Sequence, residues 1–252
     1  MELRQEDSVV TITLDRSDNN RVDEGLAAEL RHALERVSEQ DQIRLVVLTA
    51  NGSVFSTGRE EIGRSPSGQS STDWLATRRV ASALAELPVP VIVALNGDAT
   101  DHGLELALAG DLRLAVTGAR LGFSPLSRST FPWDGGTQRL PRLVGPAWAR
   151  DMLLTGRMVD AAEAYSIGLV NRVAESADHL RQITADLAAL VSAGSPLGAR
   201  YVKEAISKGL DLTLAQGLHL EADLNVILQS TTDRAEGINS FLEKRSPKFT
   251  GE

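Results

Sequence analysis

Two carboxylate side chains stand where proton transfer could occur, and the first is Glu105. It lies in NGDATDHGLELALAGDLRLA (96–115), where a strand-like segment passes through a polar, glycine-containing turn into an apolar, helix-like segment. The first turn of such a helix presents unpaired backbone N–H groups and a partial positive charge, which together stabilise an anionic oxygen. The segment therefore offers a backbone donor and a carboxylate together. The alternative is that Glu105 only compensates the helix dipole and that Gly103 only forms the turn.

The second carboxylate is Asp134, in SPLSRSTFPWDGGTQRLPRLVG (124–145), where it precedes a glycine pair. It is either a second proton-transferring group or the cap of a helix that starts near Thr137. A further glycine turn follows a strand-like segment in NGSVFSTGREEI (51–62). Together with the turn before Glu105, it could aim two backbone N–H groups at one developing oxyanion. The alternative is a simple surface loop.

The elements that must position these residues form a mixed α/β pattern in the first part of the chain. Short apolar or β-branched runs predict strands at 9–14, 45–48 and 91–97, and a helix is predicted over 26–37 from leucines at helical spacing. The order of the first three of these elements indicates a βαβ unit. Helical patterns then dominate the second half, at 147–154, 161–167, 177–192, 199–207, 214–228 and 233–243.

Between the second and third strands the sequence predicts a loop and a helix. The Gly/Ser-rich stretch 51–71 is typical of a functional or mobile loop. A helix is expected over about 73–87, ending before Pro88 because proline disfavours helical backbone in the residue that precedes it. The apolar run 104–109 predicts a buried helix.

Composition restricts the classes of protein to which the chain can belong. Its 252 residues, 42% of them hydrophobic and 24% charged, suit one large globular domain. There is no cysteine, and the four histidines show no ligand spacing, so we expect no metal site. A net charge of -8 argues against nucleic acid or an anionic membrane as partner. No apolar run approaches the roughly 20 residues that span a bilayer, and the start lacks a secretory pattern, so we expect a cytoplasmic protein.

Four segments resemble the crotonase (enoyl-CoA hydratase/isomerase) family in order, spacing and wording. They are NGDATDHGLELALAGDLRLA, FPWDGGTQRLPRLVG, LLTGRMVDAAEAYSIGLVNRV (153–173) and DRAEGINSFLEKRSPKFTG (233–251). VFSTGREEI (54–62) resembles the first oxyanion loop of that family. The resemblance covers nearly the whole chain.

The resemblance implies an α/β fold: a ClpP-like spiral of repeated ββα units over residues 1–195, followed by a C-terminal helical region over 196–252 that mediates trimerisation. It also implies a homotrimer or a dimer of trimers. The implied substrate is an acyl-CoA thioester, so coenzyme A would enter as part of the substrate and no cofactor would be tightly bound.

The resemblance also implies roles for individual residues. The thioester oxygen would be held by the backbone N–H groups of Arg59 and His102, and protons would be moved by Glu105 and by Asp134. Contacts with the substrate are expected from Thr57, Gly58, Gly103, Trp133 and Lys244, the last of these near the CoA phosphates across a subunit boundary. Where the family commonly has a glycine triplet, this chain has Asp101-His102-Gly103, so the side chain of His102 could reach into the pocket.

One departure from the family puts ordinary hydration in doubt. Family hydratases use two glutamates as an acid/base pair, and the position of the second is Pro125, which cannot transfer a proton. The leading hypothesis is therefore an atypical enzyme of the enoyl-CoA hydratase/isomerase type, a lyase or isomerase. A P-x-D-G arrangement like that around Asp134 occurs in the family's β-diketone hydrolases, so C–C cleavage of a cyclic β-diketone is an alternative. A non-catalytic trimeric member is a third possibility.

Overall fold

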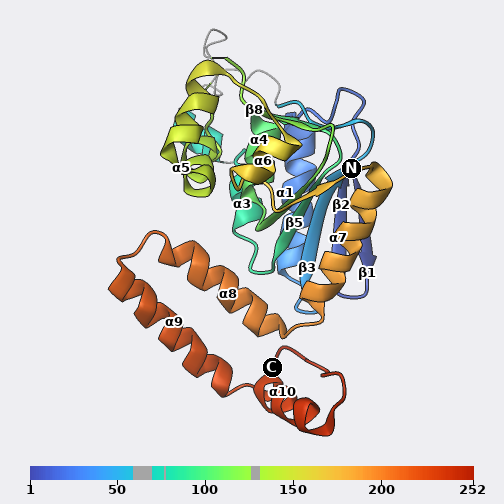
Figure 1. The fold of residues 1–252 in the computed structure, drawn as a ribbon, viewed down its shortest axis with the longest axis vertical. Coiled ribbons are helices and arrows are strands. Elements are labelled where there is room, and N and C mark those ends of the chain that lie inside the picture. The colour runs from blue at the N-terminus through green and yellow to red at the C-terminus, as the bar shows by residue number, and fades with distance from the viewer. Residues whose placement is uncertain (59–69, 77, 126–130) are drawn as a thin grey trace.

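Two β-sheets form the centre of the fold, and the chain passes back and forth between them (Figure 1). A computed structural model describes residues 1–58, 70–76, 78–125 and 131–252. The larger sheet contains β1 (Glu2–Glu6), β2 (Val9–Leu14), β3 (Leu45–Ala50), β5 (Val91–Leu95), β7 (Leu112–Val116) and β10 (Arg172–Ala174), in that order. The smaller sheet contains β4 (Val54–Ser56), β6 (Asp98–Thr100), β8 (Arg120–Gly122) and β9 (Val159–Asp160).

Strands alternate between the two sheets as the chain advances. In each of the pairs β3–β4, β5–β6 and β7–β8, the first strand joins the larger sheet and the second joins the smaller one, and helical chain follows each pair. Neighbouring turns pair in parallel in both sheets, as in β3 with β5 and in β4 with β6. This is the predicted spiral of ββα units. The predicted βαβ unit is also present, because β2 pairs in parallel with β3 across a helix.

Helices cover the sheets and then extend beyond them. Those around the sheets are α1 (Glu24–Ser38), α2 (Ser71–Ala76), α3 (Val80–Ala85), α4 (His102–Ala109), α5 (Gly136–Thr155), α6 (Ala161–Ser166) and α7 (Ala177–Ser192). The last three are α8 (Pro196–Gly209), α9 (Leu214–Gln229) and α10 (Thr232–Glu243). In the part of the chain that the structure describes, no helix is long and apolar enough to cross a bilayer.

The helix predicted over 73–87 is the main error among the predicted elements. Two short helices, α2 and α3, occupy this stretch, and α3 begins afresh at Val80. The backbone N–H groups at the start of α3 are taken by a side chain from elsewhere in the fold, as described below, which requires them to be free of a preceding helical turn. Much of the predicted loop 51–71 lies outside the described residues.

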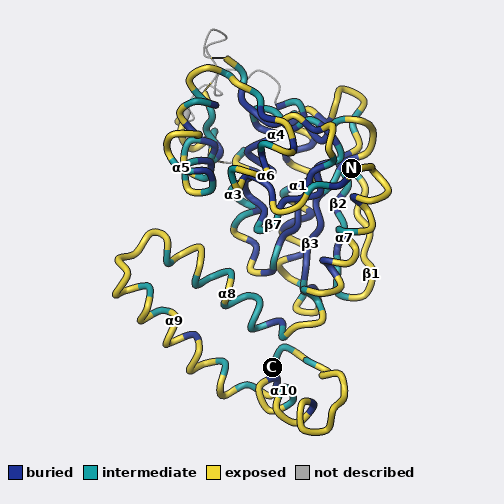
Figure 2. The backbone as a smooth tube through the Cα atoms, viewed as in Figure 1, coloured by how far each residue is buried: buried dark blue, intermediate teal, exposed yellow. Residues whose placement is uncertain are grey.

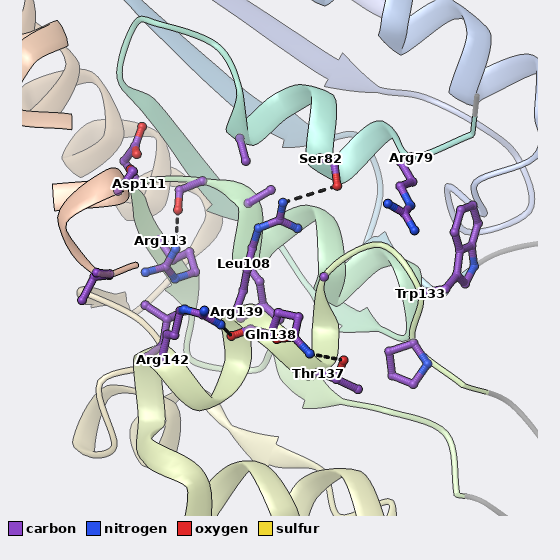
Figure 3. Close-up of a pocket in the computed structure, with 18 of the residues that line it drawn as sticks. Arg79, Ser82, Leu108, Asp111, Arg113, Trp133, Thr137, Gln138, Arg139 and Arg142 are labelled. Carbon is purple, nitrogen blue, oxygen red and sulfur yellow. Dashed lines mark hydrogen bonds between the residues drawn. The ribbon is translucent and has the colours of Figure 1, made fainter. Parts of the chain in front are cut away.

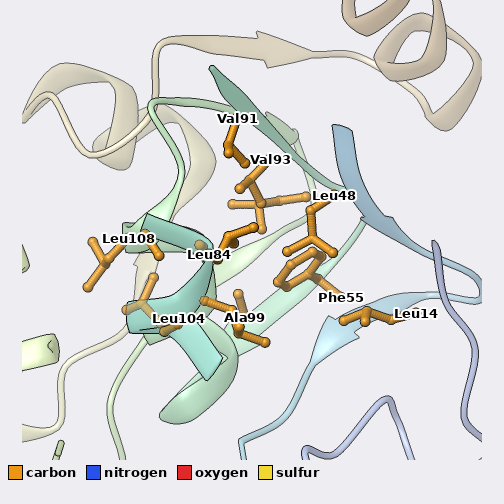
Figure 4. Close-up of a cluster of buried hydrophobic side chains, with 14 of the residues drawn as sticks. Leu14, Leu48, Phe55, Leu84, Val91, Val93, Ala99, Leu104 and Leu108 are labelled. Atoms are coloured by element: carbon orange, nitrogen blue, oxygen red, sulfur yellow. The ribbon is translucent and has the colours of Figure 1, made fainter. Parts of the chain in front are cut away.

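Both faces of the central strands β3 and β5 are buried, so these two strands are almost entirely apolar. One face of β3 and β5 packs inward with Phe55 and Leu104 in the main core (Figure 4). The opposite face packs against α7, where Leu180 and Leu187 meet Leu45. Burial of apolar surface at about 25 cal/mol per Å² dominates the stability of such layers. The result is a rigid frame for the turns that end β4 and β6.

Helices α8, α9 and α10 project away from this frame (Figure 1). Figure 2 shows that α9 and α10 are exposed along most of their length and that α8 is mostly of intermediate burial. Several large apolar side chains of these helices are exposed: Val202, Ile206, Leu214, Leu218, Val226 and Phe241. The predicted division at residues 195/196 falls between α7 and α8.

Candidate active site

The two glycine turns predicted to work together lie side by side. A Cβ on Gly103, at the start of α4, would stand 2.3 Å from the carbonyl oxygen of Ser56, so β4 and α4 are in direct backbone contact there. Gly58 has φ +97, and a Cβ on it would stand 3.1 Å from the Cβ of Asp101. The half-buried Thr57 precedes it. Arg59, the predicted first oxyanion donor, lies outside the described residues. The end of the first turn thus reaches the second.

Asp101 adopts a backbone conformation that favours glycine. Its φ of 49° and ψ of -121° lie outside the regions that L-residues commonly occupy. Its carboxylate accepts hydrogen bonds from the backbone N–H and the hydroxyl of Ser124, each at 2.6 Å. These bonds compensate strain of the order of 1–3 kcal/mol. They also tie the turn before α4 to the segment that leads to Pro125.

Glu105 is enclosed at the start of α4, with 2% of its surface exposed. One carboxyl oxygen, Oε1, accepts from the backbone N–H groups of Asp134 and Gly136, both at 2.8 Å. Burial raises the pKa of Glu105 above its usual value of 4.5, because the neighbouring His102 and the two amides only partly offset the desolvation of the charged form. A carboxyl group with a raised pKa holds its proton more readily than an ordinary glutamate, which suits it to proton transfer.

Asp134 does not cap α5, so that alternative was wrong. The N-cap of α5 is Gly135, in a left-handed conformation with φ 113°, and it makes no side-chain cap bond. The carboxylate of Asp134 instead accepts from the backbone N–H groups of Ala81 (2.7 Å) and Ser82 (3.0 Å), and from the Ser82 hydroxyl (2.7 Å). It therefore satisfies the free amides at the start of α3, which is why a helix restarts at that point.

The imidazole of His102 completes this cluster. Its Nε2 lies 3.0 Å from Oδ2 of Asp134, and its ring stacks on Trp133 with centroids 5.8 Å apart and planes 7° from parallel. Burial on its own would raise the pKa of Asp134, but the hydrogen bond and charge of His102, with the bonds from Ser82 and Ala81, lower it below 3.8. Because an ionised carboxylate only accepts, Nε2 carries the shared hydrogen.

The side chain of His102 thus points to Asp134, whereas the sequence suggested that it could enter the substrate pocket. Only 3% of the residue is exposed, and its Nδ1 is buried without a hydrogen-bond partner among the described residues. The backbone N–H of His102 is the first of α4, and the described part of the chain offers it no backbone acceptor. That amide is therefore available to an oxyanion.

A cavity of about 790 Å³ adjoins the cluster. Ser82, Trp133 and Gly135 line it, and each is bonded to, stacked on or adjacent to a member of the cluster (Figure 3). Glu105, Asp134 and His102 do not line this cavity; they lie behind its wall, each at most 3% exposed. Thr137 and Arg139, from the first turn of α5, face it as well.

Two predicted positions lie apart from the cluster. Pro125 is exposed and packs on Gly156, where an added Cβ would stand 2.7 Å from the proline Cα. Lys244 ends α10 in a left-handed conformation with φ 56°. It is exposed in the C-terminal helical region.

Sequence reasoning missed Ser82 and Arg139. Ser82 donates to Asp134 from 52 residues away, and Arg139 donates from Nη1 to the backbone carbonyl of Asp134 at 2.7 Å. Only Arg139 has a local signal in the sequence, because it lies in the first turn of α5, shortly after Asp134 and the glycine pair. Ser82 gave no signal, because its role depends on a tertiary contact.

Comparisons with known proteins find similar chains over nearly the whole length of the sequence. A family model described as enoyl-CoA hydratase/isomerase matches residues 4–252. Enoyl-CoA hydratase domain-containing protein 2 of Mus musculus, a mitochondrial protein, is 36% identical over 233 residues, which are 89% of this chain and 78% of that protein. Mitochondrial methylglutaconyl-CoA hydratase of Rattus norvegicus is 33% identical over 239 residues, 92% of this chain and 76% of that protein. The crystal structure of an enoyl-CoA hydratase from Bacillus anthracis is similar at a TM-score of 0.91 and 34% identity, covering 100% of this chain and 99% of that one.

Proposed function

The chain belongs to the enoyl-CoA hydratase/isomerase family, and on that premise we propose that it is a lyase or isomerase that acts on an acyl-CoA thioester through an enolate. The observation that carries the proposal is the buried Glu105 beside the first amide of α4. A proton-holding carboxyl group and an unpaired backbone donor stand together at one helix N-terminus. This is the pairing that an enolate intermediate requires, since charge develops on the thioester oxygen while a proton moves at carbon.

Each residue of the cluster has a separate part in this proposal. The backbone N–H groups of His102 and Arg59 hold the thioester oxygen, and Glu105 exchanges a proton with the acyl chain. Asp134 remains ionised and fixes the orientation of the His102 ring. Since Pro125 replaces the second family glutamate, a single carboxyl group moves the proton. We therefore expect slow hydration of simple enoyl-CoA substrates. We expect faster turnover in reactions such as double-bond migration, in which one base removes a proton from one carbon and returns it to another.

An assay of crotonyl-CoA hydration and of double-bond migration in 3-enoyl-CoA tests the proposal. Glu105→Gln keeps an acceptor for the two amides but cannot hold an exchangeable acid proton, so kcat should fall by roughly 10²–10⁴-fold. Glu35→Gln, on the exposed face of α1, serves as the matched control and should retain wild-type kcat. Turnover by Glu105→Gln within threefold of wild type would remove the role given to Glu105.

The His102–Asp134 contact supports a second candidate, hydrolytic C–C cleavage of a cyclic β-diketone. In the tautomer that carries its hydrogen on Nε2 and donates it to Asp134, Nδ1 is an acceptor that could take a proton from water. The two candidates differ in what they need from His102. The acyl-CoA reaction uses its backbone amide, whereas the diketone reaction uses its imidazole. Loss of a cyclic 1,3-diketone without CoA, abolished by His102→Ala, would favour the second candidate.

We also propose that the chain forms a homotrimer or a dimer of trimers through α8, α9 and α10. The support is the row of exposed apolar side chains on these helices, a feature that marks interaction surfaces. Lys244 would then meet CoA phosphates of a neighbouring subunit. A trimer without activity is the remaining alternative, and turnover of any acyl-CoA would eliminate it.

A further inference from the structure

The cavity beside the catalytic cluster has an arginine-rich wall. It is enclosed by α3, the start of α5, the end of α4 and the end of α8. Its charged lining residues are Arg79, Arg113, Arg139, Arg142, Asp111 and Asp211. Cations thus exceed anions on this wall, although the whole chain carries a net charge of -8. Such a local excess attracts an anion into one place on an otherwise acidic protein.

Two of these arginines are already engaged. Arg113 is 3% exposed and donates from Nε and Nη1 to the carbonyl oxygens of Leu169 (2.8 Å) and Gly110 (2.5 Å). Arg142 pairs with Asp211 at 2.9 Å. The remaining acid, Asp111, pairs with Lys203 at 2.9 Å. These charges are balanced within the protein and leave little for a ligand.

Arg79 and Arg139 retain donors. Arg79 precedes α3, and within the described residues its guanidinium makes no hydrogen bond or ion pair. Arg139 is half-buried; Nη1 donates to the carbonyl of Asp134, and Nη2 lies 3.5 Å from the Ser82 hydroxyl, which leaves other N–H groups of its five. Figure 3 shows Arg79 and Arg139 on the same side of the cavity as Ser82 and Trp133. Two guanidinium groups therefore face the space next to the cluster.

We infer that this cavity binds a carboxylate at the far end of the acyl group, so that the preferred substrates are thioesters of dicarboxylic acids. The inference rests on the proposed acyl-CoA function. Ser82, Trp133 and Gly135 line the cavity and are bonded to, stacked on or adjacent to members of the cluster, so the inferred carboxylate site lies next to the groups that would act on the acyl chain. Guanidinium groups match carboxylate geometry through paired N–H···O bonds. An aliphatic acyl end would leave Arg79 without a counter-charge in the cavity, whereas Arg139 already interacts with the charge of Asp134.

Binding of saturated, unreactive thioesters tests the inference. Calorimetry would compare glutaryl-CoA with pentanoyl-CoA, and adipoyl-CoA with hexanoyl-CoA, so that each pair differs only in the terminal carboxylate. Because a charge-assisted hydrogen bond typically favours binding by a factor of about ten or more, the dicarboxylic member of at least one pair should bind about tenfold more tightly. Arg79→Gln should reduce that preference to less than about threefold.

Arg78→Gln is the matched control. Its guanidinium lies 4.2 Å from the centroid of the Trp74 ring and pairs with Glu24 at 2.7 Å, and Arg78 does not line the cavity. The preference should persist in this variant. Equal binding within both wild-type pairs would overturn the inference and leave the acyl-CoA function standing, whereas binding of no thioester would overturn both. An equal loss of affinity for both members of a pair in Arg79→Gln would assign this arginine to a CoA phosphate and overturn the inference.

Discussion

Burial of the Glu105 carboxyl group lowers the stability of the folded protein at neutral pH. Its pKa in the native state is raised above 4.5, so between pH 4.5 and that raised value the native state holds a proton that the unfolded chain releases. The free energy of unfolding must therefore fall as pH rises through this window. Asp134 has a lowered pKa and contributes its own pH dependence only below about 3.8.

Glu105→Gln should remove this pH dependence. The variant has no carboxyl group to ionise at this position. Its free energy of unfolding relative to wild type should therefore increase from pH 4.5 up to the raised pKa of Glu105 and then level off. Urea unfolding at a series of pH values measures the difference, and Glu35→Gln gives the baseline for loss of a solvated carboxylate. Parallel profiles for the variant and wild type would show that the enclosed carboxyl group does not titrate as described.

Asp134→Ala should unfold the protein more readily, whatever its effect on turnover. The substitution leaves the amides of Ala81 and Ser82 without an acceptor and removes the partner of His102. Removing one member of a buried pair costs roughly 3–5 kcal/mol. Urea unfolding would measure the loss, with Asp178→Ala on the exposed surface of α7 as a control that should change little. A small effect at Asp134 would mean that water satisfies the freed groups.

Residue types and spacing singled out Glu105 and Asp134, which the structure brings into contact, but they did not predict how the two residues meet. Glu105 and Asp134 were both found from their place beside glycine turns. Their contact joins positions 29 residues apart, and the anchoring of Asp134 by Ser82 joins positions 52 apart. A local rule assigned Asp134 to the helix that follows it. In the structure its carboxylate binds the start of α3, where two backbone amides and one hydroxyl donate to it. A tertiary contact of this kind leaves no local pattern in the sequence.

At the scale of elements, the close approach of β4 and α4 sets the position of the catalytic turn. A methyl group on Gly103 would meet the Ser56 carbonyl oxygen at 2.3 Å and its Cβ at 2.6 Å, both held by the frame. Gly103→Ala should therefore destabilise the protein by about 1–3 kcal/mol. It should also lower kcat, because α4 and its first amide must move.

Thermal unfolding and kcat together measure the effect of Gly103→Ala. Gly118→Ala is the control, since an added Cβ there would meet no atom within 4 Å. If the two variants behave alike, the contact between β4 and α4 is softer than its geometry indicates. The same two measurements test the expectation that Gly103 contacts substrate. If the role of Gly103 is purely structural, the loss of kcat should be proportional to the loss of stability.

Three of the C-terminal helices were predicted well, and most of the short strands were not. The bounds of α7 matched the predicted range, α9 and α10 differ from theirs by one residue at an end, and the range 147–154 covers only the second part of α5. The strands β4, β6 and β8 contain three residues each; the first was anticipated only as a strand-like segment before a glycine turn, and the other two were not identified. A three-residue strand has too few side chains to establish an alternating pattern. These strands acquire their identity from pairing with one another, and they are the ones that carry the site.

At the scale of the whole molecule, the C-terminal helices leave a large apolar surface in solvent. Leu214 is 80% exposed and Phe241 is 82% exposed, so a single chain would leave much apolar surface in contact with water. The wild-type protein should sediment as a trimer or a larger multiple. The double variant Leu218→Asp, Val226→Asp on α9 should shift it toward a single chain, whereas Gln229→Asp should not. Wild-type protein that sediments as a monomer would contradict the proposed assembly.

The resemblance to a known family supplied the spiral and its helical extension, because the motifs that carry it span the chain in order. It did not supply the inward orientation of His102 or the arginine-rich cavity. The first depends on a departure from the glycine triplet of the family. The second depends on tertiary contacts that bring Arg79, from outside the quoted motifs, to the same cavity as Arg113 and Arg139, which lie within them. Sequence therefore fixes the framework of such a protein more firmly than the side chains that select its substrate.

The parallel stacking of Trp133 on His102 gives the site its own optical reporter. The indole of Trp133 stacks on a member of the cluster and also forms part of the cavity wall. Replacing Trp74 and Trp148 with phenylalanine would leave Trp133 as the single tryptophan. Its fluorescence would then report the arrival of a ligand, in unlabelled protein and in real time.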